Sequence, residues 1–275
     1  MLKIRGIIST IALSAVSVFP QNTISTLLST NGDVRDTIHV SVFAGGEVST
    51  AFTDRSKTGN IGNGAIGMSL TKKRLYFYAF TNIGTEGDTI TNKIGRSIID
   101  PVSSIGPFNS LLLEVRIYEA FNIPFTNYKM GIQVPASISN VMWGKTDSTG
   151  MVLQAKDAIV GSLTIATFYA ISGKMDETTT DIGFLLSAGI TMRGLGGDVF
   201  ANKFYESITG TKSKLFFGPT AGAIFQLGYI KAGIQVVKLF DPHKNKKIEG
   251  LTFTHINGTI GISAPMFEGV LKKRA

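Results

Sequence analysis

The residues of this chain that could perform acid–base chemistry are few and isolated. The three histidines, His39, His243 and His255, lie far apart, so no pair has the spacing of a zinc site. In Asp241-Pro242-His243 a carboxylate lies two residues from an imidazole, and a carboxylate can orient a histidine as a general base. The same tripeptide fits a proline-stabilised turn at the end of a strand, which is the interpretation we favour.

A glycine-rich string also invites a chemical interpretation. Gly62-Asn63-Gly64-Ala65-Ile66-Gly67 matches the Gly-x-Gly-x-x-Gly pattern of dinucleotide-binding folds, where the string follows a strand and opens a helix. Here it leads into Met68-Ser69-Leu70 and a hairpin, so we expect a bent or closely packed strand. The chain has no cysteine, which excludes a catalytic thiol and a thiolate metal site. We therefore expect no cofactor, no metal and no covalent chemistry.

A more coherent set of polar residues recurs at alternate positions of strand-like runs. In one run, one face carries Leu111, Leu113, Val115 and Ile117, and the other carries Leu112, Glu114, Arg116 and Tyr118. If the apolar faces of these runs meet lipid, the polar residues share one interior, where they either fill a lumen or line a narrow pore with anion preference. The predicted lumen network consists of Glu114, Arg116, Lys129, Gln133, Arg193, Lys231 and Gln235.

Ten strand-like runs position these residues. They lie at about 37–53, 62–70, 74–82, 110–121, 127–138, 159–171, 181–193, 214–227, 229–240 and 251–263. The connections after the second, fourth, sixth and eighth runs are short, whereas those at 83–109, 139–158 and 194–213 are long, and those at 54–61 and 241–250 are intermediate. Membrane barrels have this asymmetry, with short turns on the periplasmic side and longer loops outside.

Composition and the start of the chain agree with a membrane location. The 275 residues have a mean hydropathy of +0.21 and 17% charged residues, which is apolar for a soluble protein. Lys3 and Arg5 precede an apolar stretch at 6–19, so residues 1–22 are predicted to be a signal peptide. Residues 23–267 would then form a barrel, followed by a basic tail at 268–275. The formal net charge of +8 is scattered along the chain, which does not favour nucleic-acid binding.

Aromatic residues cluster near the ends of the predicted strands. Such residues suit the girdles at membrane–water interfaces, although aromatic side chains also favour strands in general. The clusters are Tyr76, Tyr78 and Phe80; Tyr118, Phe121 and Phe125; Phe168 and Tyr169; and Phe216, Phe217 and Tyr229.

These patterns resemble those of small outer-membrane β-barrel proteins of Gram-negative bacteria. The segments Asp181-Ile182-Gly183-Phe184-Leu185-Leu186-Ser187-Ala188-Gly189 and Gly233-Ile234-Gln235-Val236 carry the resemblance, which covers nearly the whole chain after residue 22. It implies an all-β, antiparallel, up-and-down transmembrane barrel of about ten strands, with eight or twelve as alternatives. A barrel of this kind would contact outer-membrane lipid. The run of Lys244, Lys246 and Lys247 in a predicted outer loop would meet lipopolysaccharide phosphates or be simply solvated, and we favour solvation. One departure is that Phe267 is followed by further residues, whereas such proteins often finish on an aromatic residue.

Three functions remain open from the sequence. The first is a barrel without enzymatic activity, with a structural role, in adhesion or assembly, or as a narrow transport route. Its long loops would contact a protein partner, and the candidate contact residues are Trp143, Phe200, Phe204 and Tyr205. The second is an outer-membrane hydrolase, a protease or lipid-modifying enzyme, that uses Asp241 and His243. The third is a secreted soluble β-sandwich or a lipocalin-like binding protein.

Overall fold

The computed structural model describes residues 37–53, 56–72, 74–86, 108–123, 126–146, 152–174, 181–241, 252 and 254–272. The described strands are β1 (Thr37–Thr53), β2 (Ser56–Lys72), β3 (Leu75–Glu86), β4 (Phe108–Ile123), β5 (Thr126–Thr146), β6 (Val152–Lys174), β7 (Asp181–Gly196), β8 (Leu215–Leu227), β9 (Ile230–Lys238) and β10 (Thr254–Lys272). Between β7 and β8 lie two short helices, η2 (Asp198–Lys203) and α2 (Phe204–Thr209). The predicted signal peptide lies outside the described residues.

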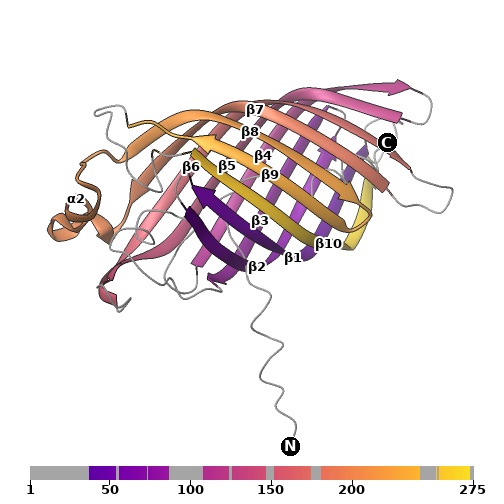
Figure 1. The fold of residues 1–275 in the computed structure, drawn as a ribbon. Coiled ribbons are helices and arrows are strands. Elements are labelled where there is room, and N and C mark those ends of the chain that lie inside the picture. Colours follow the sequence, from indigo (N-terminus) through magenta and orange to yellow (C-terminus); the bar gives the residue numbers. More distant parts are fainter. Residues whose placement is uncertain are drawn as a thin grey trace, which may run out of the picture.

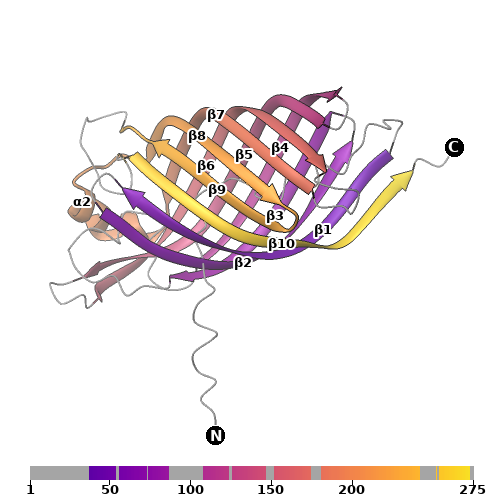
Figure 2. The same cartoon turned by 45° about the vertical axis from the view of Figure 1, so that its right-hand side comes forward.

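Every strand pairs antiparallel with its neighbours in the sequence, and β1 pairs with β10, so the sheet closes into a ten-stranded barrel (Figure 1). Figure 2 shows β1 and β10 running side by side along this seam. The predicted all-β, up-and-down barrel of ten strands is confirmed. A closed sheet has no free edge, so each strand can satisfy its backbone groups against two neighbours.

The two faces of the wall differ in chemistry as the alternating pattern predicts. On β4, Leu111 and Ile117 point outward and are 44% and 63% exposed, whereas Glu114 and Arg116 point inward and are fully buried. The same parity holds on β7, where Ile190 is 63% exposed and the next residue, Thr191, is 4% exposed. Large apolar side chains therefore cover the outside of the barrel, and small, polar and aromatic side chains fill the inside.

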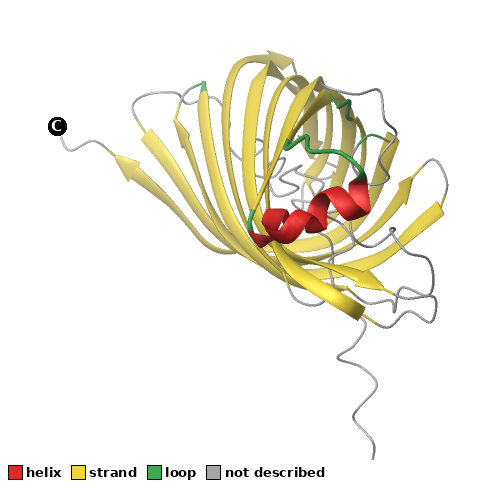
Figure 3. Cartoon of the chain, turned by 90° about the vertical axis from the view of Figure 1, so that its left-hand side faces the viewer, coloured by secondary structure: helices red, strands yellow, loops and turns green. Residues whose placement is uncertain are grey.

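The two ends of the barrel differ in their connections. At one end, which we call the turn end, β2–β3, β4–β5 and β8–β9 are joined by two residues each, with Gly228 at a φ of 56° in the last of these turns. At the other end, the loop end, β3 and β4 are separated by residues 87–107, and α2 lies near the mouth of the barrel (Figure 3). Both described termini, Thr37 and Lys272, lie at the turn end.

Several strands at the loop end are longer than predicted. The expected connections at 54–61 and 139–158 are mostly strand, because β2 begins at Ser56 and the β5–β6 pairing extends to Thr146 and Val152. Beyond the membrane both faces of a strand meet water, so the alternation that reveals a strand in the sequence fades there. The expected basic tail is also partly strand, since β10 continues to Lys272 and pairs with β1.

No helix among the described residues has the length and the apolar character required to cross a membrane.

Candidate functional site

The interior of the barrel holds the polar residues that the alternation placed there. Each of the seven is at most 5% exposed: Glu114, Arg116, Lys129, Gln133, Arg193, Lys231 and Gln235. They are not one cluster, because they come from β4, β5, β7 and β9. The β4–β5 register brings Arg116 opposite Gln133, and Gln235 donates from Nε2 to Thr220 Oγ1 at 3.3 Å. Four of the seven, Glu114, Arg116, Lys129 and Gln133, lie on the neighbouring strands β4 and β5.

Glu114 and Arg116 form an ion pair inside the barrel. The Nε of Arg116 donates to Oε1 of Glu114 at 2.5 Å, and both side chains have no exposure to solvent. The pair exists because residues two apart on a strand point to the same face. Removing one partner from such a pair leaves an uncompensated buried charge, which typically costs about 3–5 kcal/mol. The two side chains therefore depend on each other.

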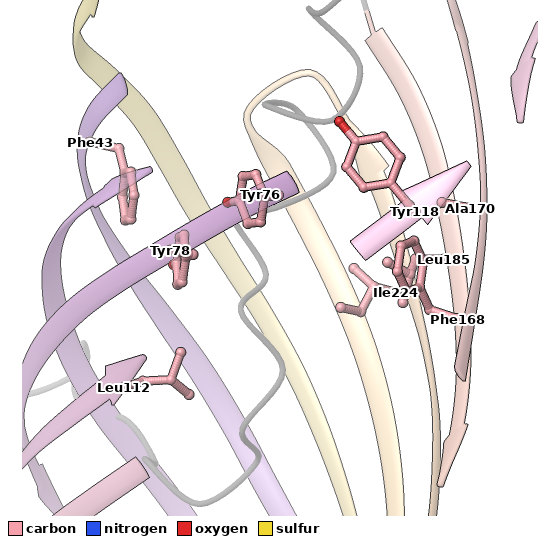
Figure 4. Packing of buried hydrophobic residues seen from close by; sticks show 9 residues of the cluster. All are labelled: Phe43, Tyr76, Tyr78, Leu112, Tyr118, Phe168, Ala170, Leu185 and Ile224. Carbon is pink, nitrogen blue, oxygen red and sulfur yellow. The ribbon is translucent and has the colours of Figure 1, made fainter. Parts of the chain in front are cut away.

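The guanidinium of Arg116 is also held between two aromatic rings. Its Cζ lies 5.7 Å from the centroid of the Tyr76 ring and 5.1 Å from that of the Phe168 ring, both within cation–π range. Tyr76 stacks on Tyr78 at 6.2 Å, and Tyr78 stacks on Phe43 at 5.3 Å. We call these five residues, Phe43, Tyr78, Tyr76, Arg116 and Phe168, the lumen stack. They come from β1, β3, β4 and β6, and Figure 4 shows its four rings among the buried apolar residues.

The rings of the lumen stack correct part of the girdle prediction. Tyr76, Tyr78, Tyr118, Phe168 and Phe216 are at most 4% exposed and point into the barrel. Of the aromatic residues predicted at the interfaces, Phe121, Tyr169, Phe217 and Tyr229 are exposed, whereas Phe125 and the side chain of Phe80 lie outside what the structure describes. The signal that separates the two groups is parity, since Phe168 and Tyr169 are adjacent and so face opposite sides. The clustering of aromatic residues near strand ends does not indicate which face of the wall each ring occupies.

The closed packing leaves several polar atoms unsatisfied. Glu114 Oε2, both Nη atoms of Arg116, and both amide atoms of Gln133 have no hydrogen-bond partner among the described residues, and all are buried. A buried polar group without a partner costs about 1–3 kcal/mol. The contacts that the structure describes around Arg116 are therefore the two ring contacts and the ion pair with Glu114.

The connection between β7 and β8, residues 197–214, forms an ordered structure that we call the loop-end segment. Val199, Phe204 and Tyr205 are at most 3% exposed, and the rings of Phe200 and Tyr205 lie 4.6 Å apart. The segment begins at Gly197, whose φ of 91° favours glycine and whose β-carbon, if present, would lie 2.8 Å from the carbonyl oxygen of Asp157. Packing against the end of β6 thus fixes where the segment starts.

Asp241, just after β9, fastens the other end of the loop-end segment. Its Oδ1 accepts from Ser213 Oγ at 2.6 Å, and its Oδ2 accepts from Thr211 Oγ1 at 3.1 Å. The hydroxyl of Tyr205 donates to the carbonyl of Ser213 at 2.7 Å. Both oxygens of Asp241 are therefore engaged in holding the segment, and the geometry is that of a structural clasp. His243, its expected partner in the hydrolase interpretation, lies outside the described residues.

The predicted contact residues do not form an exposed surface. Trp143 is not in a loop, because it lies on β5 and pairs with Lys156 of β6. Phe204 and Tyr205 are 3% and 1% exposed, so they anchor the loop-end segment and cannot meet a partner in this arrangement. Phe200 is half-buried, with Lys214 Nζ 4.2 Å above its ring. Aromatic residues in a predicted loop suggested recognition, but here they bury themselves against the barrel mouth.

The glycine-rich string lies within a strand, as expected, but close packing is not found at Gly64, where an added β-carbon would meet nothing within 4 Å. Gly62 to Gly67 lie within β2, paired with β1 on one side and β3 on the other, with no helix following. Within the ranges that the structure describes, no three acidic or histidine side chains are close enough to hold a metal ion.

Comparisons with known proteins give distant likenesses of structure. No family model and no curated protein sequence matches the chain. The outer membrane protease OmpT from Escherichia coli is 10% identical, with 85% of this chain and 98% of that chain covered and a TM-score of 0.37. The translocator domain of the autotransporter NalP from Neisseria meningitidis is 8% identical, with coverage of 88% and 92% and a TM-score of 0.37. LpxR from Salmonella typhimurium is 11% identical, with coverage of 79% and 99% and a TM-score of 0.34. Likeness at this level carries no conclusion about activity.

The architecture of the barrel indicates whether it resides in water or in a lipid bilayer. In water, a wall with many large apolar side chains 37–66% exposed and charged side chains fully buried would be inside out. In a bilayer the same wall is the stable arrangement, because lipid covers the apolar face and the closed sheet leaves no backbone edge in hydrocarbon. The alternative of a soluble sandwich or lipocalin-like protein does not fit this wall, and the chain is an integral membrane protein built as a closed, antiparallel ten-stranded β-barrel.

Proposed function

We propose that the protein is a membrane-anchored scaffold that presents the loop-end segment at the cell surface, in adhesion or in assembly with surface molecules. The observation that supports this role is the contrast between the two candidate sites. The lumen at Arg116 is filled by buried side chains, whereas the loop-end segment is ordered, clasped and partly exposed. A rigid surface on a fixed barrel binds with little loss of conformational freedom.

The chemistry of the loop-end segment favours a partner that carries phosphate. Lys203, Lys212 and Lys214 are exposed, and Lys212 forms a long ion pair of 3.7 Å with Glu206. Longer loops of such barrels face outward, so these ammonium groups would lie at the level of the lipopolysaccharide phosphates. Cationic side chains are attracted to such a surface over about a Debye length. Lipopolysaccharide is therefore the partner we propose for this surface.

The hydrolase alternative receives less support from the geometry. Its acid would be Asp241, but both carboxylate oxygens accept hydrogen bonds from Thr211 and Ser213, as a buried structural carboxylate does. The partners that the structure gives for these two oxygens are hydroxyl groups of the loop-end segment, which supports a structural role for the carboxylate. Replacement of His243 by Ala tests this alternative directly, because loss of peptide or lipid hydrolysis in the variant would restore it.

The experiment for the scaffold role is a binding measurement on the barrel in phospholipid nanodiscs. The triple variant Lys203→Gln, Lys212→Gln, Lys214→Gln should bind purified lipopolysaccharide at least fivefold more weakly than the wild type, and added salt should weaken wild-type binding. Lys72→Gln is the matched control, because Lys72 is an exposed lysine at the turn end. Equal affinity in the wild type and the triple variant would refute the proposed contact.

A further inference from the structure

The last strand of the barrel continues past the closed part of the sheet at the turn end. The pairing of β10 with β9 stops where Ile262 lies opposite Ile230, because β9 begins there. On its other side β10 remains paired with β1 as far as Lys272, which lies opposite Thr37. Figure 2 shows β1 and β10 extending together beyond the β8–β9 turn. Residues 263–272 therefore form a strand edge that has β1 as its one neighbour among the described strands.

This edge lies outside the hydrocarbon of the membrane. Unpaired backbone N–H and C=O groups are too costly in lipid, so a strand edge persists only where water or protein reaches it. The aromatic residues nearby agree with an interfacial position, because Tyr229 in the β8–β9 turn is 60% exposed and Phe267 is 58% exposed. Short turns of outer-membrane barrels face the periplasm, so the edge would be presented to that compartment.

The backbone of the edge offers a defined stretch for pairing. Pro265 has no N–H, and the pairing with β1 is irregular beside it, since Phe267 lies opposite Val42 and Pro265 lies opposite Phe43. Proline and bulges are features that protect edges from indiscriminate pairing. Residues 267–272 then pair with β1 without interruption. In an antiparallel pair every second residue directs its N–H and C=O away from its partner, so this stretch presents a regular row of hydrogen-bonding groups to a further strand.

The side chains beside this stretch indicate what the added strand would contain. The ring of Phe267 lies close to Gly269, where an added β-carbon would be 2.8 Å from the ring Cζ, so an exposed aromatic surface flanks the edge. The strand ends at Lys272, and the next two residues in the sequence are also basic, whereas Glu268 is the one acidic residue of this stretch. An apolar strand that carries carboxylates at one end is complementary to both features.

We infer that residues 267–272 of β10 are a docking edge for an extended segment of a partner protein, which adds to the sheet as a strand antiparallel to β10 and carries carboxylates near its N-terminal end. A strand in this direction continues the line of β9, so its C-terminal end meets the β8–β9 turn and its N-terminal end lies beside Lys272. The docking edge lies at the opposite end of the barrel from the loop-end segment, so this inference goes beyond the scaffold role and does not depend on it.

Hydrogen exchange of the barrel in phospholipid nanodiscs tests the edge itself. Within residues 267–272, the amides directed away from β1 should exchange at least tenfold faster than those of residues 257–262, which have partners on both sides. A probe peptide should slow this exchange at least tenfold. The probe is a decapeptide with two glutamates at its N-terminal end, followed by alternating valine and threonine. Equal protection of all amides in residues 257–272 without the peptide would overturn the inference.

Binding of the fluorescently labelled probe, measured by polarisation, tests the chemistry of the partner. Replacing both glutamates of the probe by lysine should weaken binding at least tenfold, and Lys272→Gln should weaken binding of the original probe at least threefold. Lys156→Gln at the loop end is the matched control and should leave the affinity unchanged. Of two probes N-methylated at odd or at even positions, one should lose binding, because a strand uses alternate N–H groups. Equal binding of both N-methylated probes would refute strand addition.

Proline substitutions test the edge from the side of the barrel. Gly269→Pro and Val270→Pro remove the N–H groups of adjacent residues, which point to opposite sides of the strand. The variant that removes the N–H directed away from β1 should keep the fold, checked by the gel-mobility shift on boiling, and should bind the probe at least tenfold more weakly. Wild-type probe affinity in each variant that folds would overturn the inference. Lipopolysaccharide affinity is read separately, so failure of the docking edge and failure of the scaffold role are distinguishable.

Discussion

Replacing Gly189 by Ala should destabilise the barrel because β6 and β7 approach too closely for a side chain there. An added β-carbon would lie 2.1 Å from the carbonyl oxygen of Ile165 and 2.5 Å from the α-carbon of Ala166. Favourable carbon contacts begin near about 3.5 Å, so the paired strand would have to retreat by roughly an ångström. Overpacking of this kind costs about 1–3 kcal/mol. Ala also lowers the conformational entropy of the unfolded chain relative to Gly, and this offsets about 0.4–1 kcal/mol of the loss in stability.

Gly194, on the same strand, is the matched control. An added β-carbon there meets nothing within 4 Å, so Gly194→Ala should be neutral or more stable by up to about 1 kcal/mol. The assay is urea unfolding of the refolded barrel in phospholipid vesicles, followed by the fluorescence of Trp143, the single tryptophan. The two variants should differ by roughly 2 kcal/mol in unfolding free energy. Equal stabilities, or a more stable Gly189→Ala, would refute the close strand approach.

Two further changes probe the lipid face and the clasp. Ile190→Arg should lower the free energy of unfolding by about 2–4 kcal/mol, because it places a charge on the lipid-facing side of the wall. The control Thr191→Ser changes the neighbouring residue inside the barrel and should lower the free energy of unfolding by less than half as much. Urea unfolding in vesicles measures both variants. Asp241→Ala should remove two hydrogen bonds from Thr211 and Ser213 and expose the loop-end segment to trypsin at least tenfold faster, with the barrel melting temperature little changed. An unchanged cleavage rate would show that packing alone holds the segment.

The wall of the barrel could be predicted from the sequence because lipid imposes one rule on every strand. The alternation of Leu111 to Ile117 with Glu114 and Arg116 gave the correct inward face, and all ten strands were located. Outside the membrane lipid no longer imposes this alternation, so the sequence predicts a loop where β5 in fact extends to Thr146 and β6 begins at Val152.

The arrangement inside the barrel could not be predicted in the same way. Parity places Tyr76, Arg116 and Phe168 in one interior, but their contact depends on the register between β3, β4, β5 and β6. Register follows from the pairing of whole strands and from turn geometry, and the alternation of faces alone leaves shifts by two residues open. The clasp at Asp241 has the same origin, because it joins residues about thirty positions apart through the curvature of the wall.

The seam between β1 and β10 has a consequence for biogenesis. Thr37 pairs with Lys272, so the partners are almost the full described length apart, and the cylinder cannot be completed until the final strand has been synthesised and delivered. Until then the incomplete sheet has two unpaired edge strands and an exposed apolar face in water. Unpaired edges and exposed apolar surface promote aggregation. This architecture therefore calls for a holding factor that shields both edges during transit, and it makes the last nineteen-residue strand the step that commits the polypeptide to its membrane.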